Sequence, residues 1–279
     1  LSKSSKANIN DPLVISEEII ASNDDSTKFL INADKLFLTE SFQQVKSSYP
    51  SSYKGFKLGS LSKDKTRYSE INNYPENTDV IVDYVYENKY PTKRGSLAVT
   101  DSRVVTIKIQ HSLIKVPYNN YVPRYDDPRI GYFHTQTNDM TSIDQINYKD
   151  MIHRWNLVKK DPSKKISDPI KPITWWIENT TPYEFRDIIK EGVESWNLAF
   201  EFAGFKNAIE VKIQPDSADW DAGDIRYNVL RWTSSPNPPF GGYGPSFVNP
   251  RTGEILGADI MLEWVYITNR IKYDFLYDD

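Results

Sequence analysis

Histidine is the first place to look for chemistry in this sequence, because it occurs only three times, as His111, His134 and His153. Two histidines four residues apart would lie on one face of a helix and could bind a metal ion together, and no pair here has that spacing. No zinc site built from these residues is therefore expected. His111 continues the apolar side of a predicted strand, so it is predicted to be a packed, hydrogen-bonded core residue rather than a ligand.

Carboxylates form the second candidate. The stretch from Asp216 to Asp224 (DSADWDAGD) carries four of them. Oxygen ligands suit Ca²⁺, but the spacing differs from that of an EF-hand loop, so a solvated acidic loop is the preferred interpretation and calcium binding stays open. The sequence has no cysteine and no Gly-x-Ser-x-Gly, phosphate-binding or dinucleotide-binding motif. Residue chemistry alone therefore assigns no catalytic residue and no metal ligand.

The element that the sequence defines best is a long helix at residues 181–204, preceded by a strand at residues 174–177. Residues 181–184 (TPYE) match a capping box with Thr181 as N-cap, and Gly204 stands where a left-handed C-terminal cap is expected. Apolar residues recur with the helical period and predict a buried face with Trp196 at its centre. These residues are Phe185, Ile188, Ile189, Val193, Trp196, Ala199, Phe200 and Ala203.

Strands are also predicted at residues 208–213 and 225–232, with a hairpin beyond them. The two strands of the hairpin, 246–248 and 255–262, flank the turn sequence NPRTG. The apolar spacing after residue 262 is again helical. Because an amphipathic helix of this kind needs a sheet to lie on, the expected fold class is α+β.

The composition limits the class of protein. With 39% hydrophobic and 26% charged residues, the 279-residue chain is globular, and its length suggests about two domains. A net charge of −4 gives no reason to expect nucleic acid, and no apolar run reaches the ~20 residues of a membrane-spanning helix. Residues 161–172 (DPSKKISDPIKP), rich in proline and lysine, are predicted to link a β-rich domain, 1–160, to a second domain, 173–279.

The sequence resembles a known group of enzymes in several places. The stretch WWIENTTPYEFRDIIKEGVESWNLAFEFAGFKNAIEVK, then DIRYNVLRW, then GPSFVNPRTGEILGADI, is similar to the large bacterial zinc-dependent metalloproteases. Those enzymes place β-rich domains of unknown function ahead of a metzincin-type peptidase domain, and residues 104–117 and 123–133 resemble that upstream domain. The resemblance implies a metzincin-like mixed sheet with one long packed helix after residue 172, here as the N-terminal half of a peptidase domain.

The same resemblance transfers no catalytic residue. The family binds zinc through an H-E-x-x-H-x-x-G-x-x-H helix whose glutamate is the general base, and no part of that motif occurs here. Zinc is therefore expected in the full-length protein and not in this chain, which is expected to be inactive by itself. The sequence begins at Leu1 without Met, as after removal of a leader or inside a longer precursor. A secreted, periplasmic or cell-surface bacterial protein is implied.

A substrate-binding segment is the site that the resemblance does transfer. In metzincins an edge strand of the sheet pairs with extended substrate, and it lies where this sequence has residues 243–248. The implied substrate-binding residues are Tyr243, Gly244, Ser246, Phe247 and Val248. Glycines around this segment let the backbone approach a ligand, and Pro245 is tolerated at a sheet edge. The expected partners are a peptide or protein substrate and the remainder of the peptidase domain.

A second interpretation belongs to a different class of protein. The 18 Tyr, 12 Phe and 7 Trp residues suit core packing, but Trp and Tyr on a β-rich domain can also hold glycans or peptides. The chain would then be a non-catalytic extracellular peptide- or glycan-binding module.

Overall fold

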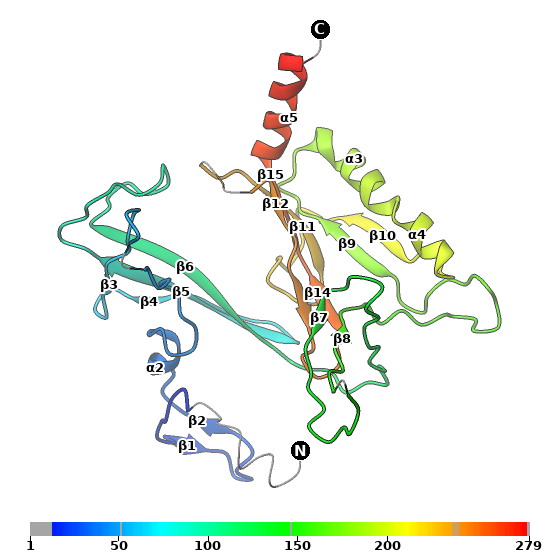
Figure 1. Ribbon diagram of the computed structural model, residues 1–279, viewed down its shortest axis with the longest axis horizontal. Helices are drawn as coiled ribbons and strands as arrows, with labels where there is room; N and C mark the ends of the chain where they lie inside the picture. Colours follow the sequence, from blue (N-terminus) through cyan, green and yellow to red (C-terminus); the bar gives the residue numbers. More distant parts are fainter. Residues whose placement is uncertain (1–12, 51, 146, 237, 239, 278–279) are drawn as a thin grey trace. The chain divides into compact units, whose positions relative to one another are not determined.

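The structure is a computed structural model that describes residues 13–277 except 51, 146, 237 and 239. The chain divides into two compact units, Ser2–Leu113 and Ile114–Asp279, which are described separately below. Strands predominate over helices in the described residues, so the fold is of the β-rich α+β kind that the sequence predicts (Figure 1). No helix among these residues is long and apolar enough to cross a membrane.

The first unit is built around one long strand, β5, which pairs with β3, β4 and β6. Its described elements are β1 (Ala21–Ser22), β2 (Phe29–Leu30), α2 (Asp34–Phe37), β3 (Ser60–Leu61), β4 (Arg67–Asn73), β5 (Asn77–Glu87) and β6 (Val104–Ile114). Val82 and Tyr84 of β5 are fully buried and pack with Phe37 of α2. His111 of β6 is also buried, and its Nε2 lies 2.9 Å from the hydroxyl of Tyr84. The prediction of a packed, hydrogen-bonded core histidine is confirmed.

The second unit contains a five-stranded sheet in the order β10-β9-β11-β15-β12. The elements of this sheet and its helices are β9 (Ile173–Ile177), α3 (Tyr183–Glu194), α4 (Asn197–Phe202), β10 (Ile209–Ile213), β11 (Asn228–Thr233), β12 (Gly242–Tyr243), β15 (Ile260–Glu263) and α5 (Trp264–Tyr277). Four neighbouring strands are parallel, and β12 is antiparallel to β15 at one edge. The predicted strands are therefore present, and the sheet is mixed.

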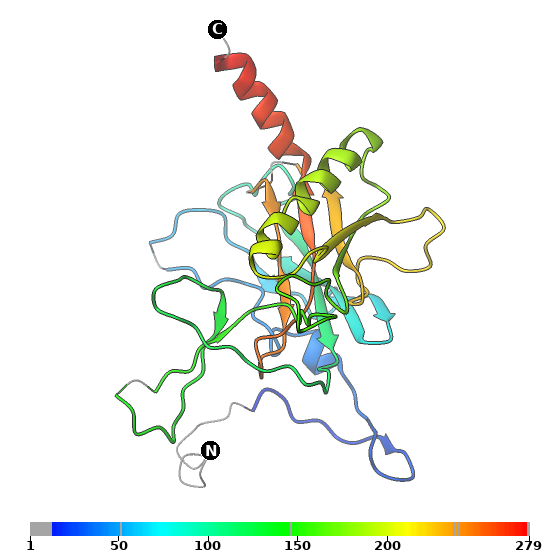
Figure 2. The same ribbon diagram turned by 90° about the vertical axis from the view of Figure 1, so that its right-hand side faces the viewer.

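Helices α3 and α4 lie on one face of this sheet (Figure 2). Ile189, Val193 and Phe200 pack there against the buried residues Ile173 and Trp175 of β9 and their neighbours. After α4 the chain turns through Gly204, whose φ of +93° is the left-handed C-terminal conformation that the sequence predicts. Helix α5 leaves the sheet directly after β15 (Figure 1).

The predicted long helix is wrong in three respects. The helix is interrupted between Glu194 and Asn197, and no side chain caps its N-terminus, where Pro182 rather than Thr181 is the N-cap. Trp196, predicted at the centre of the buried face, is 64% exposed.

Hydrogen bonds from polar side chains explain why the inner face of this helical region differs from the predicted one. The side chain of Asn197 pairs with β10, accepting from the backbone N–H of Ile209 and donating to its carbonyl, both at 2.9 Å. That pairing holds Asn197 on the inner side and turns Trp196 outward. Arg186 is buried as well, because its guanidinium donates to the carbonyls of Thr181 and Asn179 at 2.8 and 2.6 Å.

The segment predicted as a linker, 161–172, lies inside the second unit. The backbone N–H of Lys160 donates to Asp168 O at 2.8 Å, and that of Ile170 donates to Val158 O at 2.8 Å. Ser167 forms a parallel bridge with Phe205. The two compact units divide at residues 113 and 114.

Candidate functional site

The antiparallel edge of the sheet is the first part of the candidate site. β12 pairs with β15, and β13 (Ser246–Val248) pairs with β14 (Ile255–Ala258). The pairs Tyr243–Met261 and Phe247–Gly257 share one register, so residues 242–247 run along residues 257–262 as one hairpin arm. The register changes only between Phe247 and Val248. Residues 242–248 are called the edge segment below. The hairpin and its turn at residues 249–253 are as predicted.

The structure places all five predicted substrate-binding residues on this edge segment. Tyr243 belongs to β12, Ser246, Phe247 and Val248 belong to β13, and Gly244 lies between the two strands. Tyr243, Gly244 and Ser246 are exposed, whereas Phe247 and Val248 are half-buried.

Hydrogen bonds to residues 259–263 determine which backbone groups of the edge segment face outward. The carbonyl of Gly241 accepts from Glu263 N at 3.1 Å, and the carbonyl of Pro245 accepts from Asp259 N at 3.1 Å. Because backbone groups alternate in direction along an antiparallel strand, the N–H and C=O groups of Gly242, Gly244 and Ser246 point away from β15. Pro245 has no N–H, but an N–H at that position would have faced β15. Gly242, Gly244 and Ser246 therefore each keep an outward-facing N–H donor.

No described strand pairs with the outer side of the edge segment. β12 is the last strand in the sheet order, and β13 pairs only with β14. A strand edge of this kind offers a row of N–H and C=O groups to another extended chain. The outward groups of Gly242, Gly244 and Ser246 are therefore placed for pairing with a peptide, and two of the three residues have no side chain in the way.

A buried carboxylate fixes the loop that leads into β12. Glu263 is 4% exposed and accepts hydrogen bonds from Ser235 N at 3.1 Å and Ser235 Oγ at 2.5 Å. These bonds lower the pKa of Glu263. Gly241 then lies against α5, since a Cβ atom there would be only 2.5 Å from Cδ2 of Tyr266. Ser235 and Gly241 are thus both held in place ahead of the edge segment.

The far end of the hairpin is held by the segment before residue 160. Glu254 is 5% exposed, and its carboxylate accepts from the side-chain amides of Asn119 at 2.9 Å and Asn156 at 3.0 Å. The backbone of Arg154 pairs with both sides of Glu254, donating to Gly253 O and accepting from Ile255 N. Gly253 itself has a φ of +77°, and a Cβ there would be 2.5 Å from the carbonyl oxygen of Ile152. The turn is therefore tied to residues 119–156.

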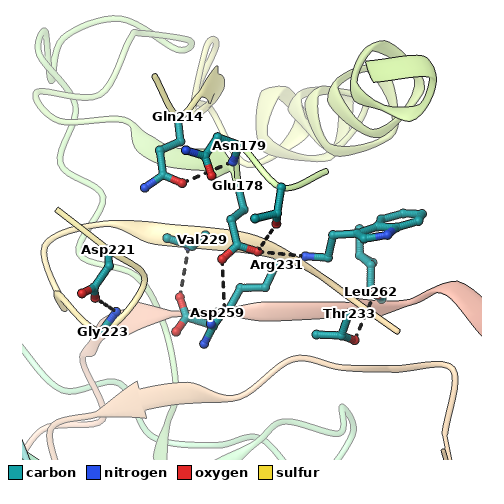
Figure 3. A network of polar contacts seen from close by, with 12 residues as sticks. Glu178, Asn179, Gln214, Asp221, Gly223, Val229, Arg231, Thr233, Asp259 and Leu262 are labelled. Atoms are coloured by element: carbon teal, nitrogen blue, oxygen red, sulfur yellow. Dashed lines mark hydrogen bonds and ion pairs between the residues drawn. The ribbon is translucent and has the colours of Figure 1, made fainter. Parts of the chain in front are cut away.

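Other carboxylates near the strand ends have structural partners (Figure 3). The carboxylate of Glu178, just after β9, accepts from Trp232 N at 3.2 Å and lies 3.7 Å from Nε of Arg231. Asp259, just before β15, accepts from Val229 N at 3.1 Å. Both carboxylates join neighbouring strands, and their bonding indicates a structural role.

The acidic stretch and the remaining histidines do not form a metal centre. Asp224 is 1% exposed and is held by the guanidinium of Arg226 at 2.6 Å, while Asp221 accepts from Gly223 N at 2.7 Å. His153 lies 3.0 Å from Oγ1 of Thr135, and burial lowers its pKa. Among the residues that the structure describes, no group of three or more His, Cys, Asp or Glu side chains could hold a metal ion.

The comparisons with known proteins give one family. Residues 1–160 match the family described as Domain of unknown function (DUF5117). The chain belongs to the DUF5117 family. No peptidase family matches it. No curated protein and no solved structure matches the chain either. The family match ends at residue 160, inside the unit Ile114–Asp279, so it includes the Asn119 and Asn156 side chains that hold Glu254.

Sequence reasoning missed the residues that flank the edge segment. Tyr266 and Arg270 stand four residues apart on α5, and the guanidinium carbon of Arg270 lies 4.7 Å from the centre of the Tyr266 ring. Their spacing was a usable signal, because residues four apart share a helix face. The contact of Tyr266 with Gly241 had no signal in the sequence, since it depends on how α5 leaves β15.

Proposed function

We propose that this chain supplies the peptide-binding wall of a secreted bacterial zinc-dependent endopeptidase of the metzincin type. The observation that carries the proposal is the antiparallel edge segment, which ends an otherwise parallel sheet and has no partner strand on its outer side among the described residues. The likeness of the sequence around residues 175–262 to the large bacterial zinc-dependent metalloproteases supports the same assignment. An extended substrate would pair with Gly242, Gly244 and Ser246 through its backbone.

In this proposal the chain binds and orients the substrate and does not itself cut it. Pairing through N–H and C=O groups fixes the direction and register of a peptide whatever its side chains are. The described His, Asp and Glu residues do not fit a zinc site, and the sequence contains no H-E-x-x-H motif. The metal, with its bound water and general base, would come from the part of the full-length protein that carries that motif.

A proline substitution on the outward row tests the pairing. Gly244→Pro removes an outward N–H and adds a ring on the side where the peptide would lie, while the bonds of Gly241 and Pro245 to β15 are left in place. Gly244→Ala is the matched control, because a Cβ at this position would be 3.5 Å from Ile260 Cγ1, an ordinary contact. Binding of a short fluorescein-labelled peptide rich in valine and threonine would be measured by fluorescence polarisation.

We expect the alanine variant to bind like the wild type and the proline variant to bind at least about tenfold more weakly, which corresponds to ~1.4 kcal/mol. Thermal melts of both variants check that the sheet is intact. Equal affinity for the peptide in a folded Gly244→Pro variant would contradict the proposal.

The alternative is a non-catalytic extracellular module that binds peptide or glycan. Glycan binding needs aromatic faces that are open to a sugar ring, and one aromatic group in the second unit is Trp176, Trp220 and Tyr227. Trp220 and Tyr227 stack on each other with ring centres 3.8 Å apart, and Trp176 meets both edge-on. Because these rings cover one another, this group does not favour glycan binding by the second unit.

A further inference from the structure

A hollow of about 660 Å³ lies between the loop that leads into β12 and helix α5. Its walls include Phe240, Gly241, Tyr266, Arg270, Tyr273 and Asp274. This volume is within the usual range of pockets that hold small ligands or side chains.

The hollow lies next to the start of the edge segment. Gly241 lines the hollow and immediately precedes β12, and the ring of Phe240 lies 6.1 Å from that of Tyr243. Because side chains alternate between the faces of a strand, Tyr243 projects to the same face as the missing Cβ of Gly241, which is the face that Tyr266 covers. A peptide paired with Gly242 would therefore pass the mouth of the hollow.

The walls of the hollow are aromatic, and their rings are half open to solvent. Phe240, Tyr266 and Tyr273 are 44%, 50% and 59% exposed. The guanidinium of Arg270 is held over the Tyr266 ring, with Nη2 donating to the Tyr266 hydroxyl at 2.6 Å. A stacked guanidinium has a second face that can take another aromatic ring. Asp274 lies in the same wall and opposes the approach of an acidic group.

Aromatic contacts at the start of α5 hold this wall in place. Trp264 packs against Phe185 of α3 and Trp232 of β11, with ring centres 5.6 and 5.7 Å apart. Glu263, the residue before it, is buried and bonded to Ser235. The start of α5 is thus anchored by the packing of Trp264, and Ser235 is anchored by its bonds to Glu263.

We propose that this hollow is a specificity pocket that takes an aromatic side chain of the peptide bound along the edge segment. The inference rests on the proposed function and adds a substrate class to it, namely extended peptides with Phe, Tyr or Trp at one position. The ring would lie between Phe240 and the Tyr266–Arg270 stack. Its burial would add affinity to the backbone pairing.

The test is a double-mutant cycle between peptide and protein. Fluorescein-labelled peptides with the valine- and threonine-rich background carry Phe, Leu, Glu or Ala at each position in turn, and their affinities are measured for the wild type, Tyr266→Ala and Lys272→Ala. Lys272 is an exposed residue of α5 outside the walls of the hollow and serves as the control position.

At one position, the Phe peptide is expected to bind the wild type and Lys272→Ala about tenfold more tightly than the Ala peptide does. In Tyr266→Ala that advantage should fall to about twofold or less, because the Phe peptide should lose more affinity than the Ala peptide does. A merely structural role for Tyr266 would instead weaken both peptides equally and would overturn the inference.

Other outcomes separate this inference from the proposed function. If all peptides bind the wild type equally and Gly244→Pro weakens them all, the edge pairing stands and the aromatic pocket is refuted. If the Glu peptide binds best, the hollow is an anion site and the inference is again refuted. If no peptide binds the wild type, both proposals fail.

Discussion

At the residue scale, polar side chains decide which way the helical region faces. Asn197 takes an inner position because its amide pairs with both backbone groups of Ile209. Arg186 takes a second inner position because its guanidinium donates hydrogen bonds to two carbonyls of the turn before α3. The apolar period of the sequence indicates a helix but cannot show these bonds, since their partners lie in other segments. The buried face therefore differs from the one that the apolar period predicts, and Trp196 lies on the exposed side.

Substitutions on the two sides of the helix test the corrected orientation. Ile189→Ala removes a side chain that packs on the core of the sheet and should cost about 2–3 kcal/mol of unfolding free energy. Trp196→Ala removes an exposed ring and should cost less than about 1 kcal/mol. Urea melts of both variants measure the difference. A larger loss for Trp196→Ala than for Ile189→Ala would restore the orientation predicted from the sequence.

His111 gives the first unit a dependence on pH. Burial lowers its pKa below the usual value of about 6.5, so the unfolded chain binds the proton more readily than the folded one. The stability is therefore complete above pH ~6.5 and decreases as the pH falls towards the lowered pKa. His111→Gln should flatten this part of the stability profile in melts of the fragment 2–113. An unchanged slope would mean that another group titrates. The packing role of His111 was predictable because strand alternation places it on an apolar side.

At the element scale, α3 contains a glycine that no neighbour requires. A Cβ atom at Gly192 would meet nothing within 4 Å. Glycine in the interior of a helix costs about 0.5–1 kcal/mol relative to alanine because it loses more backbone freedom on folding. Gly192→Ala is therefore expected to raise the stability by that amount in thermal or urea melts. Gly59→Ala is the contrasting variant, since its Cβ would lie 1.9 Å from Glu87 O and should be strongly destabilising.

Strands and the hairpin were the most predictable elements of the second unit. β10, β11 and the β13–β14 hairpin follow local apolar runs and a turn sequence with glycine at the left-handed position. The edge position of β12 came only from the family resemblance, because two residues carry too little pattern to be recognised. The hollow beside it was not predictable, since its two walls are separated in sequence and meet only through the path of α5.

At the scale of the whole molecule, the family match and the compact units have different boundaries. The match ends at residue 160, whereas the units divide at residues 113 and 114. Residues 114–160 therefore belong to the matched family and also to the unit that carries the edge segment. Composition suggested a linker at 161–172 because proline and lysine are common there, but composition cannot show that these residues bond to neighbouring segments.

Fragments cut at the two boundaries should behave differently. The fragment 114–279 keeps Asn119 and Asn156 and is expected to fold, as shown by a cooperative melt and dispersed NMR signals. The fragment 161–279 leaves the carboxylate of Glu254 without its two amide partners, each worth about 1.5–3 kcal/mol for a charged acceptor, and should not fold cooperatively. A cooperative melt of 161–279 with the stability of 114–279 would show that residues 114–160 are dispensable.

The composition of the edge segment has a consequence for solubility. A long unpaired strand edge is a template on which copies of a chain aggregate into cross-β fibres. Gly242, Gly244 and Pro245 are among the residues least suited to β structure, so this edge is a poor nucleus for such growth. A partner that arrives already extended can still form its hydrogen bonds, because those depend on the backbone. Gly242 and Gly244, which leave room for a ligand, therefore also hinder self-assembly, together with Pro245.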